Sequence, residues 1–266
     1  MGLFQKKTAL EREWVRLEKQ EARFLSLRAA KQETRLNRML EEKVPEKLQD
    51  TLNTAFAKAF SLIFEKGTSV IEKTYNREEM EKNFLINEYT VDIKKDYKSL
   101  RTFSRNAGKA EVKNLFLTGA SGVGMGLLGI GLPDIPLFAG ILLKSIYEIA
   151  MNYGYEYESE GEQYWILLLV QGALSYGERM LQIDKEVNSY MNSRTCPAGY
   201  SKEKMIHETA MCLSGEILYM KFLQGIPVVG AVGGAYDAVY LKRVAEYAEL
   251  KYRRRFYQDK YGSRVS

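Results

Sequence analysis

The sequence predicts an all-α fold, a helical bundle with two glycine-rich apolar helical hairpins and a long charged N-terminal helix. The chain has only 5 prolines in 266 residues and long stretches without the Asn-Gly or Asp-Gly pairs that turn β-hairpins. Its apolar residues recur at helical spacing. Glycine is concentrated in two apolar segments. Each glycine inside a helix destabilises it by about 1 kcal/mol relative to alanine, so we expect these glycines to be there because they let helices pack closely.

The N-terminal segment predicts one long helix, from about Thr8 to Val44, which Pro45 ends. It is dense in charged residues, and its apolar residues fall mostly on one stripe: Leu10, Trp14, Leu17, Phe24, Leu36 and Leu40. We therefore expect residues 1–44 to form a charged helical arm and residues 45–266 to form the main helical domain.

Two further helices are expected before the first glycine-rich segment. One has an apolar residue every fourth position, at Leu48, Leu52, Phe56, Phe60 and Phe64, and Gly67 is its candidate C-cap. The other runs from Glu78 to about Lys113. Its stripe of Phe84, Tyr89, Ile93, Tyr97 and Leu100 is expected to face the core.

The second half of the chain predicts four more helices. Those at Leu137–Tyr153 and Tyr164–Met180 are too continuously apolar to be half exposed, so both should be buried. A loop at residues 192–202 precedes an amphipathic helix at Lys202–Leu223, and a final basic helix ends near Tyr261.

The glycine-rich segments contain the small-x-x-x-small spacing that lets two helix backbones touch, at Gly122 and Gly126 and again at Gly230 and Gly234. A phosphate-binding loop is the alternative. However, Met125 stands where a P-loop has lysine, and Pro133 follows too soon after the Gly-x-Gly-x-x-Gly match for a dinucleotide-binding helix. We therefore interpret the four glycines as helix-packing residues.

The ionisable residues in apolar surroundings are the candidate functional or structural polar residues. Asp134 and Asp237 each lie in apolar sequence, where a structural ion pair, a helix cap and an acid-base carboxylate pair are the open roles. Lys144 and Glu148 lie four apart on one helix face, and Lys242 with Glu246 repeats that spacing after the second glycine-rich segment.

Motifs for catalysis and for metal binding are missing from the sequence. His207 is the only histidine, so that neither a zinc-protease helix nor a histidine cluster can form, and the two cysteines, Cys196 and Cys212, have no other imidazole as a base. No Gly-x-Ser-x-Gly elbow occurs. We expect no catalytic residues, no metal and no cofactor.

Charge and apolar content point to a membrane surface as one partner. Residues 1–49 hold 12 Lys and Arg against 8 Asp and Glu, and residues 242–260 hold 7 against 3. Such basic ends suit an anionic surface, and since no nucleic-acid-binding motif accompanies them, no nucleic acid is expected. Leu115–Leu132 approaches the length of a membrane span, so that a re-entrant or interfacial hairpin and a buried soluble core both stay open.

The expected location is the cytoplasm. The chain begins without an apolar run that could serve as a secretory signal, and its two cysteines suit a reducing compartment. Its mean hydropathy of -0.32 excludes a polytopic membrane protein. Peripheral attachment or partial insertion at the inner face of the cell membrane is compatible with all three observations.

Three motifs together resemble the EcsC family of bacterial proteins. They are Gly131-Leu-Pro-Asp134-Ile-Pro-Leu137 after a glycine-rich run, Ile146-Tyr-Glu-Ile-Ala-Met-Asn-Tyr-Gly154-Tyr-Glu, and Gln224-Gly-Ile-Pro-Val-Val-Gly-Ala-Val-Gly-Gly234 leading to Tyr240-Leu-Lys-Arg-Val. The resemblance runs from about Val44 to Phe256, so that the arm at residues 1–43 is longer than the family core requires. Asp134 falls on the family's Asp-x-Pro position, whereas Asp237 stands where relatives are expected to have asparagine.

The resemblance implies a family whose namesake is encoded with the ATPase and membrane subunits of an ABC exporter that affects protein secretion, and whose own activity is unassigned. We therefore expect a non-enzymatic, membrane-associated accessory or regulatory protein, with transporter subunits or other proteins as partners. Two alternatives stay open: a hydrolase that uses a buried carboxylate at Asp134, and a soluble helical scaffold that binds a partner. The oligomeric state is not predicted by the sequence.

Overall fold

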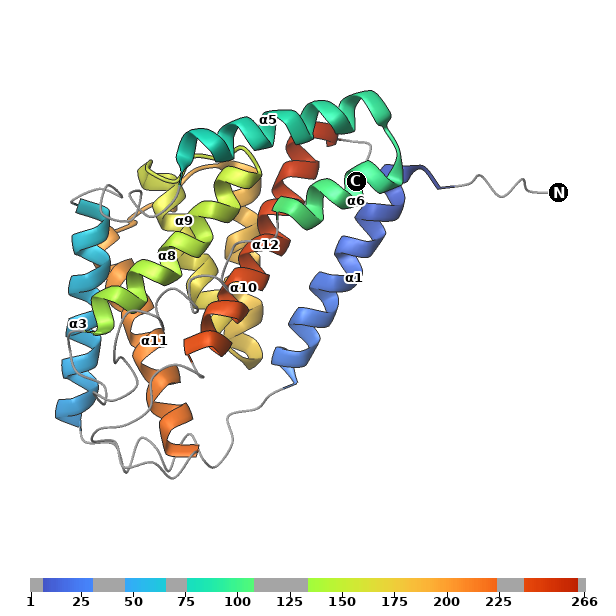
Figure 1. The fold of residues 1–266 in the computed structure, drawn as a ribbon. Coiled ribbons are helices and arrows are strands. Elements are labelled where there is room, and N and C mark those ends of the chain that lie inside the picture. The colour runs from blue at the N-terminus through green and yellow to red at the C-terminus, as the bar shows by residue number, and fades with distance from the viewer. Residues whose placement is uncertain (1–6, 31–45, 66–75, 108–133, 224–236, 263–266) are drawn as a thin grey trace.

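The computed structural model describes residues 7–30, 46–65, 76–107, 134–223 and 237–262. These residues fold into a bundle of α-helices, and no strand occurs among them (Figure 1). The all-α fold class is confirmed. The helices are α1 (Ala9–Ala29), α3 (Glu46–Glu65), α5 (Arg77–Lys94), α6 (Tyr97–Ala107), α8 (Asp134–Asn152), α9 (Glu160–Leu174), α10 (Gly177–Ser193), α11 (Lys202–Leu223) and α12 (Asp237–Tyr261).

Helix α9 forms the centre of the bundle. Every residue from Glu162 to Leu174 is buried, because α10, α11 and α12 pack around it. The continuous apolar run at Trp165–Val170 predicted this burial, and the prediction is confirmed. Helix α8 packs against α12, α3 and α5 and is also buried along most of its length, as expected.

Gly172 permits close contact between three of these helices. A Cβ atom at this position of α9 would lie 2.8 Å from Cε1 of Tyr247 in α12 and 3.3 Å from Cγ2 of Ile183 in α10. Real Cβ atoms do not approach other atoms so closely, so only glycine lets the three helices meet here.

Helix α1 is part of the bundle. Its first turn is fixed by a capping box, in which Thr8 Oγ1 accepts from the Glu11 backbone N–H at 3.2 Å and Glu11 Oε2 accepts from the Thr8 N–H at 2.7 Å. Leu17 and Phe24 are buried where α1 packs against α6, α10 and α12. The remainder of the expected helix to Val44 lies outside the described residues. The division of the chain at residue 44 stays a prediction.

Helix α3 confirms the predicted stripe. Leu52, Phe56, Phe60 and Phe64 are all buried, against α11 and α8. Gly67 lies outside the described residues, as do Gly122, Gly126, Gly230 and Gly234, so that the two glycine-rich hairpins stay predictions.

The single helix expected from Glu78 to Lys113 is wrong, because the chain forms two helices there. Lys95 adopts a left-handed conformation with φ 48° and ends α5. The Asp96 side chain then accepts from the Ser99 backbone N–H at 2.6 Å, which starts α6 one residue later. The prediction that Tyr89 and Ile93 face the core is also wrong, since they are 68% and 62% exposed.

The helix expected at Tyr164–Met180 is likewise two helices. Helix α9 ends at Leu174 and α10 begins at Gly177, whose φ of 58° turns the chain between them. The sequence analysis did not find α10 as a separate helix. Helices α11 and α12 confirm the expected helix at Lys202–Leu223 and the expected end near Tyr261.

Within the described helices, none has the length together with the apolar content that would be needed to cross a membrane. Leu115–Leu132, the segment that approaches such a length, lies outside the described residues.

Candidate functional site

The predicted pair on α8 forms in the structure. Lys144 Nζ lies 3.6 Å from Glu148 Oε1, and the two side chains are only 10% and 9% exposed. Burying an ion pair removes both charges from water, and their attraction offsets that desolvation only when each is well matched. Lys144 and Glu148 therefore act as a structural ion pair of the interior. The corresponding residues of α12, Lys242 and Glu246, are exposed, so the two segments share a spacing but not an environment.

The two predicted aspartates lie at equivalent places in the fold. Asp134 is the first residue of α8 and Asp237 is the first residue of α12. A carboxylate in the first turn of a helix interacts favourably with the helix dipole, which is compatible with the structural role considered for both. Helix α8 begins three residues earlier than the expected start at Leu137. The side chains of both aspartates lie outside the described part of the structure.

A buried polar cluster surrounds Lys251 on α12. Its side chain is 2% exposed, and its Nζ lies 2.8 Å from Asp184 Oδ1 and 3.6 Å from Glu21 Oε1. The same amine donates to Asn188 Oδ1 at 2.9 Å. Tyr247 adds a hydroxyl that donates to Asp184 Oδ1 at 2.6 Å, and its ring stacks on Phe24. Helices α1, α10 and α12 are thus joined by one buried set of charges.

The next arginines of α12 extend this cluster toward α1. Arg254 Nε donates to both carboxylate oxygens of Glu21, at 2.9 and 2.8 Å, and its guanidinium lies over the Trp14 ring. Arg253 donates to Gln20 Oε1 at 2.5 Å and lies 3.4 Å from Glu249. Because a planar guanidinium fits a carboxylate with two bonds, these contacts also fix the orientation of α1.

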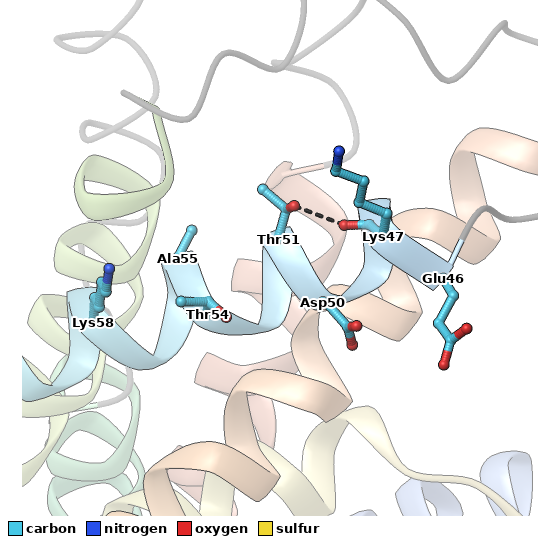
Figure 2. Close-up of a pocket in the computed structure, with 7 residues that line it drawn as sticks. All are labelled: Glu46, Lys47, Asp50, Thr51, Thr54, Ala55 and Lys58. Carbon is cyan, nitrogen blue, oxygen red and sulfur yellow. Dashed lines mark hydrogen bonds between the residues drawn. The ribbon is translucent and has the colours of Figure 1, made fainter.

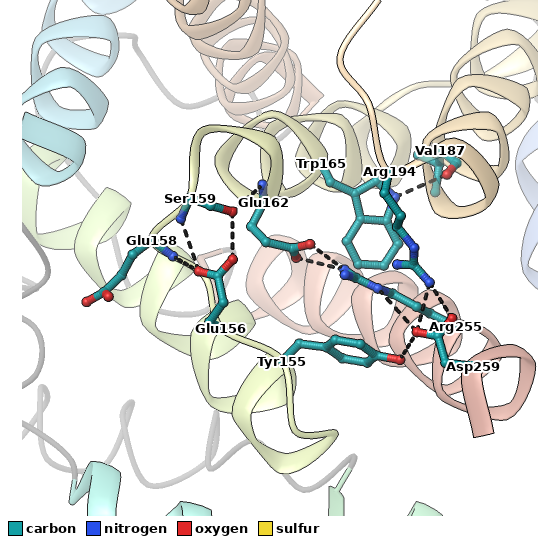
Figure 3. A network of polar contacts seen from close by, with 10 residues as sticks. All are labelled: Tyr155, Glu156, Glu158, Ser159, Glu162, Trp165, Val187, Arg194, Arg255 and Asp259. Carbon is teal, nitrogen blue, oxygen red and sulfur yellow. Dashed lines mark hydrogen bonds and ion pairs between the residues drawn. The ribbon is translucent and has the colours of Figure 1, made fainter.

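Arg255, one turn beyond Lys251 on α12, lies in a second cluster (Figure 3). Its Nη1 is 2.7 Å from Glu162 Oε1, and its guanidinium lies over the rings of Tyr155 and Trp165. Asp259 accepts from Arg194 at 2.6 and 2.8 Å and from the Tyr155 hydroxyl at 2.6 Å. The cluster joins α9 and α12 to the segments that follow α8 and α10.

Three cations of the basic terminal helix cannot face an anionic surface. Lys251, Arg253 and Arg255 are buried. The physical reason is that carboxylates from α1, α9 and α10, together with Glu249 on α12 itself, lie opposite them, and a buried charge is stable when it is paired and hydrogen-bonded. The excess of positive charge in the sequence did not reveal Glu21, Glu162 and Asp184 as partners because they lie far away along the chain.

Burial controls the protonation of several groups in these clusters. It raises the pKa of Glu162 above its usual value, although Arg255 opposes that shift. It likewise raises the pKa of Glu249, against the opposing effect of Arg253, and it raises the pKa of Tyr153 and Tyr247 well above the usual value. The tyrosines are therefore neutral hydrogen-bond donors, and the clusters hold helices together through fixed charges.

The cysteines do not have the environment of nucleophiles. Burial raises the pKa of the Cys212 thiol, although Arg179 lies 3.8 Å from its Sγ and opposes the shift, and burial also raises the pKa of Cys196. A nucleophilic cysteine needs the opposite shift, because the thiolate is the reactive form. Within the described part of the chain, no group of three or more His, Cys, Asp or Glu residues could hold a metal ion.

A hollow of about 680 Å³ lies beside α3, and its lining residues all come from that one helix (Figure 2). Lys47, Asp50 and Lys58 are among them, and the Thr51 hydroxyl bonds back to the Lys47 carbonyl at 2.6 Å. A smaller hollow next to it includes His207 of α11, which places the single histidine at the surface between α3 and α11. Neither hollow brings two of the predicted site residues together.

The outer face of α5 is the feature that sequence reasoning missed. Leu85, Ile86, Tyr89 and Ile93 are between 53% and 68% exposed. Of the nine large apolar side chains exposed in the described residues, these four lie on one helix. The sequence shows that Tyr89 and Ile93 lie on one face of a helix, but the spacing does not tell whether that face meets the core or the solvent. The signal that could have separated the two faces is the second set of apolar residues in the same helix, Phe84 and Val91.

The fold and these sites define the class as an all-α protein whose interior charges are used for helix packing and whose surface carries one apolar helix face. The chain belongs to the EcsC protein family, since the model of that family matches residues 10–256 of the 266. The match begins within α1, earlier than the start near Val44 expected from the motifs. Comparisons with curated proteins and with solved structures found no match.

Proposed function

We propose that this EcsC family protein is a non-enzymatic accessory or regulatory protein that acts at a membrane surface beside an ABC exporter. The observation that carries the proposal is the way the side chains are divided between interior and surface. The ionisable residues around α12 are matched with one another, whereas the exposed large apolar side chains are concentrated on α5.

The interior clusters support a binding role. A general acid or base must reach a substrate within about 2.6–3.2 Å, directly or through one water. Lys251, Arg255 and Glu162 are each 9% exposed or less as side chains and are directed at one another or at other side chains of the bundle. Their arrangement favours a rigid body that presents a surface to a partner.

The surface supports a membrane as that partner. Soluble proteins rarely expose contiguous apolar side chains without a binding role, because water disfavours them. The link to an exporter comes from the family resemblance, whose namesake is encoded with transporter subunits. We propose those subunits, or other proteins, as additional partners at the membrane.

Fractionation of cells that produce the full chain tests this function. The proposal predicts recovery of the protein with the membranes at low salt, and release of part of it by high salt if charge contributes to attachment. Recovery of all the protein in the soluble fraction at low salt would overturn the proposal and favour the soluble scaffold.

A further inference from the structure

Helix α5 has two apolar faces, and only one of them is packed. On the inner face, Val91 is buried and Phe84 meets the rings of Phe103 and Phe256 at centroid distances of 6.2 and 6.3 Å. The outer face carries Leu85, Ile86, Tyr89 and Ile93, here called the α5 stripe. Leu85, Tyr89 and Ile93 recur every fourth residue and Ile86 lies three residues before Tyr89, so the four stay on one side of the helix for two turns. A solvated helix face is normally polar, so the stripe needs an explanation.

The surroundings of the stripe are basic at one end. Five exposed cations follow the stripe along the chain, and we call them the basic corner: Lys94, Lys95 and Lys98 where α5 turns into α6, and Arg101 and Arg105 further along α6. Among the described residues, none of the five takes part in an ion pair. Exposed Arg12 of α1 adds a further cation near the corner, because its guanidinium lies over the Tyr97 ring.

Three acidic residues near the stripe take part in ion pairs, and two of them share a single lysine. Lys260 of α12 lies 2.8 Å from Glu88 and 2.9 Å from Asp92, and Arg77 lies 3.1 Å from Glu81. Asp96 is hydrogen-bonded to the first turn of α6. The other carboxylates of α5, Glu78 and Glu79, lie in its first turn, at the opposite end from the basic corner. The five cations of the corner therefore outnumber the charge of Asp96 and the one carboxylate charge that Lys260 leaves unbalanced.

We propose that α5 rests on an anionic lipid bilayer, with the α5 stripe among the lipid headgroups and acyl chains and with the basic corner on lipid phosphates. This inference rests on the proposed function and names its contact surface. Helix α5 lies across one end of the bundle (Figure 1). A helix with an apolar ridge flanked by lysines lies in the plane of a membrane interface, and the long lysine stems reach back to the headgroups.

The expected contributions follow from the exposed side chains. Each large apolar side chain that leaves water favours binding by about tenfold, allowing for its partial exposure. Each lysine near an anionic leaflet favours binding by about fivefold. Stripe and corner therefore contribute comparable amounts, and neither alone should account for the affinity.

Sedimentation of the full chain with vesicles tests the inference. Vesicles of phosphatidylcholine alone are compared with vesicles of phosphatidylcholine and phosphatidylglycerol in equal parts. Leu85→Ser with Ile93→Ser removes half of the stripe and should weaken binding to the anionic vesicles by about 100-fold. Lys94→Gln with Lys95→Gln should weaken it by about 25-fold and should reduce the preference for anionic over neutral vesicles by the same factor.

Two substitutions elsewhere serve as matched controls. Leu27 on α1 is 68% exposed, and the Lys204 side chain on α11 is 75% exposed. Leu27→Ser and Lys204→Gln change the same kinds of side chain away from α5 and should leave vesicle binding unchanged. Circular dichroism melting confirms that all variants fold, since every substituted residue is exposed.

The outcomes separate this inference from the proposed function. Binding of the stripe variant as tightly as the wild type would overturn the inference. Recovery of the wild type with cell membranes, combined with no binding to pure lipid vesicles, would also overturn it, because a membrane protein would then hold the chain there while the proposed function stands. Absence from the membrane fraction of cells overturns the proposed function itself.

Discussion

Lys251→Met is expected to lower the free energy of unfolding by about 3 kcal/mol, near the low end of the range for breaking a buried ion pair. The lysine amine lies 2.8 Å from Asp184 and 3.6 Å from Glu21, and its side chain is 2% exposed. Methionine fills the same space without the charge, so the substitution leaves two carboxylates in the interior with one cation fewer. The penalty arises from those carboxylates, because water cannot reach them to replace the amine.

The low end of the range follows from the partners that remain. Glu21 keeps its two bonds from Arg254, and Asp184 keeps the Tyr247 hydroxyl and the Asn188 amide, at 2.6 and 3.0 Å. For a chain of this size, a change of about 3 kcal/mol corresponds to a decrease in melting temperature of roughly 6–12 °C. Both quantities can be measured by urea and thermal unfolding followed by circular dichroism.

A double-mutant cycle identifies the source of the effect. Asp184→Asn combined with Lys251→Met should cost less than the sum of the two single changes by about 1–3 kcal/mol, because the second change removes a charge that the first left unmatched. The control is Lys204→Met, which alters an exposed pair and should change stability by less than about 0.5 kcal/mol. A Lys251→Met protein as stable as the wild type would refute the reasoning.

Three further predictions follow from single contacts. Gly172→Val should destabilise the protein by about 1–3 kcal/mol in urea unfolding, because its Cβ would lie 2.8 Å from Tyr247; unchanged stability would contradict the packing described. Burial raises the pKa of the Cys212 thiol, so Cys212 should react slowly with iodoacetamide at neutral pH and faster as the pH rises past the ordinary pKa of 9.0. Fast reaction at neutral pH would contradict the raised pKa. The pKa of Glu162 is raised in the folded state. The difference in unfolding free energy between the wild type and Glu162→Gln should therefore be most favourable to the wild type below the ordinary pKa of 4.5, and this advantage should be lost as the pH rises through the folded value. Outside that pH range the difference should stay constant.

The helices that could be predicted from the sequence are those whose apolar residues either form one stripe or run without interruption by polar residues. The period of four in α3 and the continuous run in α9 are of this kind, and both are buried as expected. The breaks at Lys95 and Gly177 were missed because a single residue in the left-handed region ends a helix without changing the apolar pattern around it. Asp96, three residues before Ser99, was the available signal for a new helix start.

The candidate sites were less predictable, because contact partners far apart in the chain decide them. Lys144 and Glu148 were found since they lie within one helical turn of each other. Glu21 and Arg254 are separated by most of the chain, so their pairing could be seen only in the folded bundle. The α5 stripe shows the same limit, because apolar spacing identifies a face but not what covers it.

The claim that α5 contacts lipid is tested most directly by a fluorescent probe in the stripe. Tyr89→Trp places an indole at a position that is 68% exposed, and Leu181→Trp does the same on α10, where the side chain is 41% exposed. With anionic vesicles that contain brominated lipid, we predict a blue shift and quenching for the probe at position 89 and no change at position 181. Equal quenching at both positions, or none at position 89, would contradict the account.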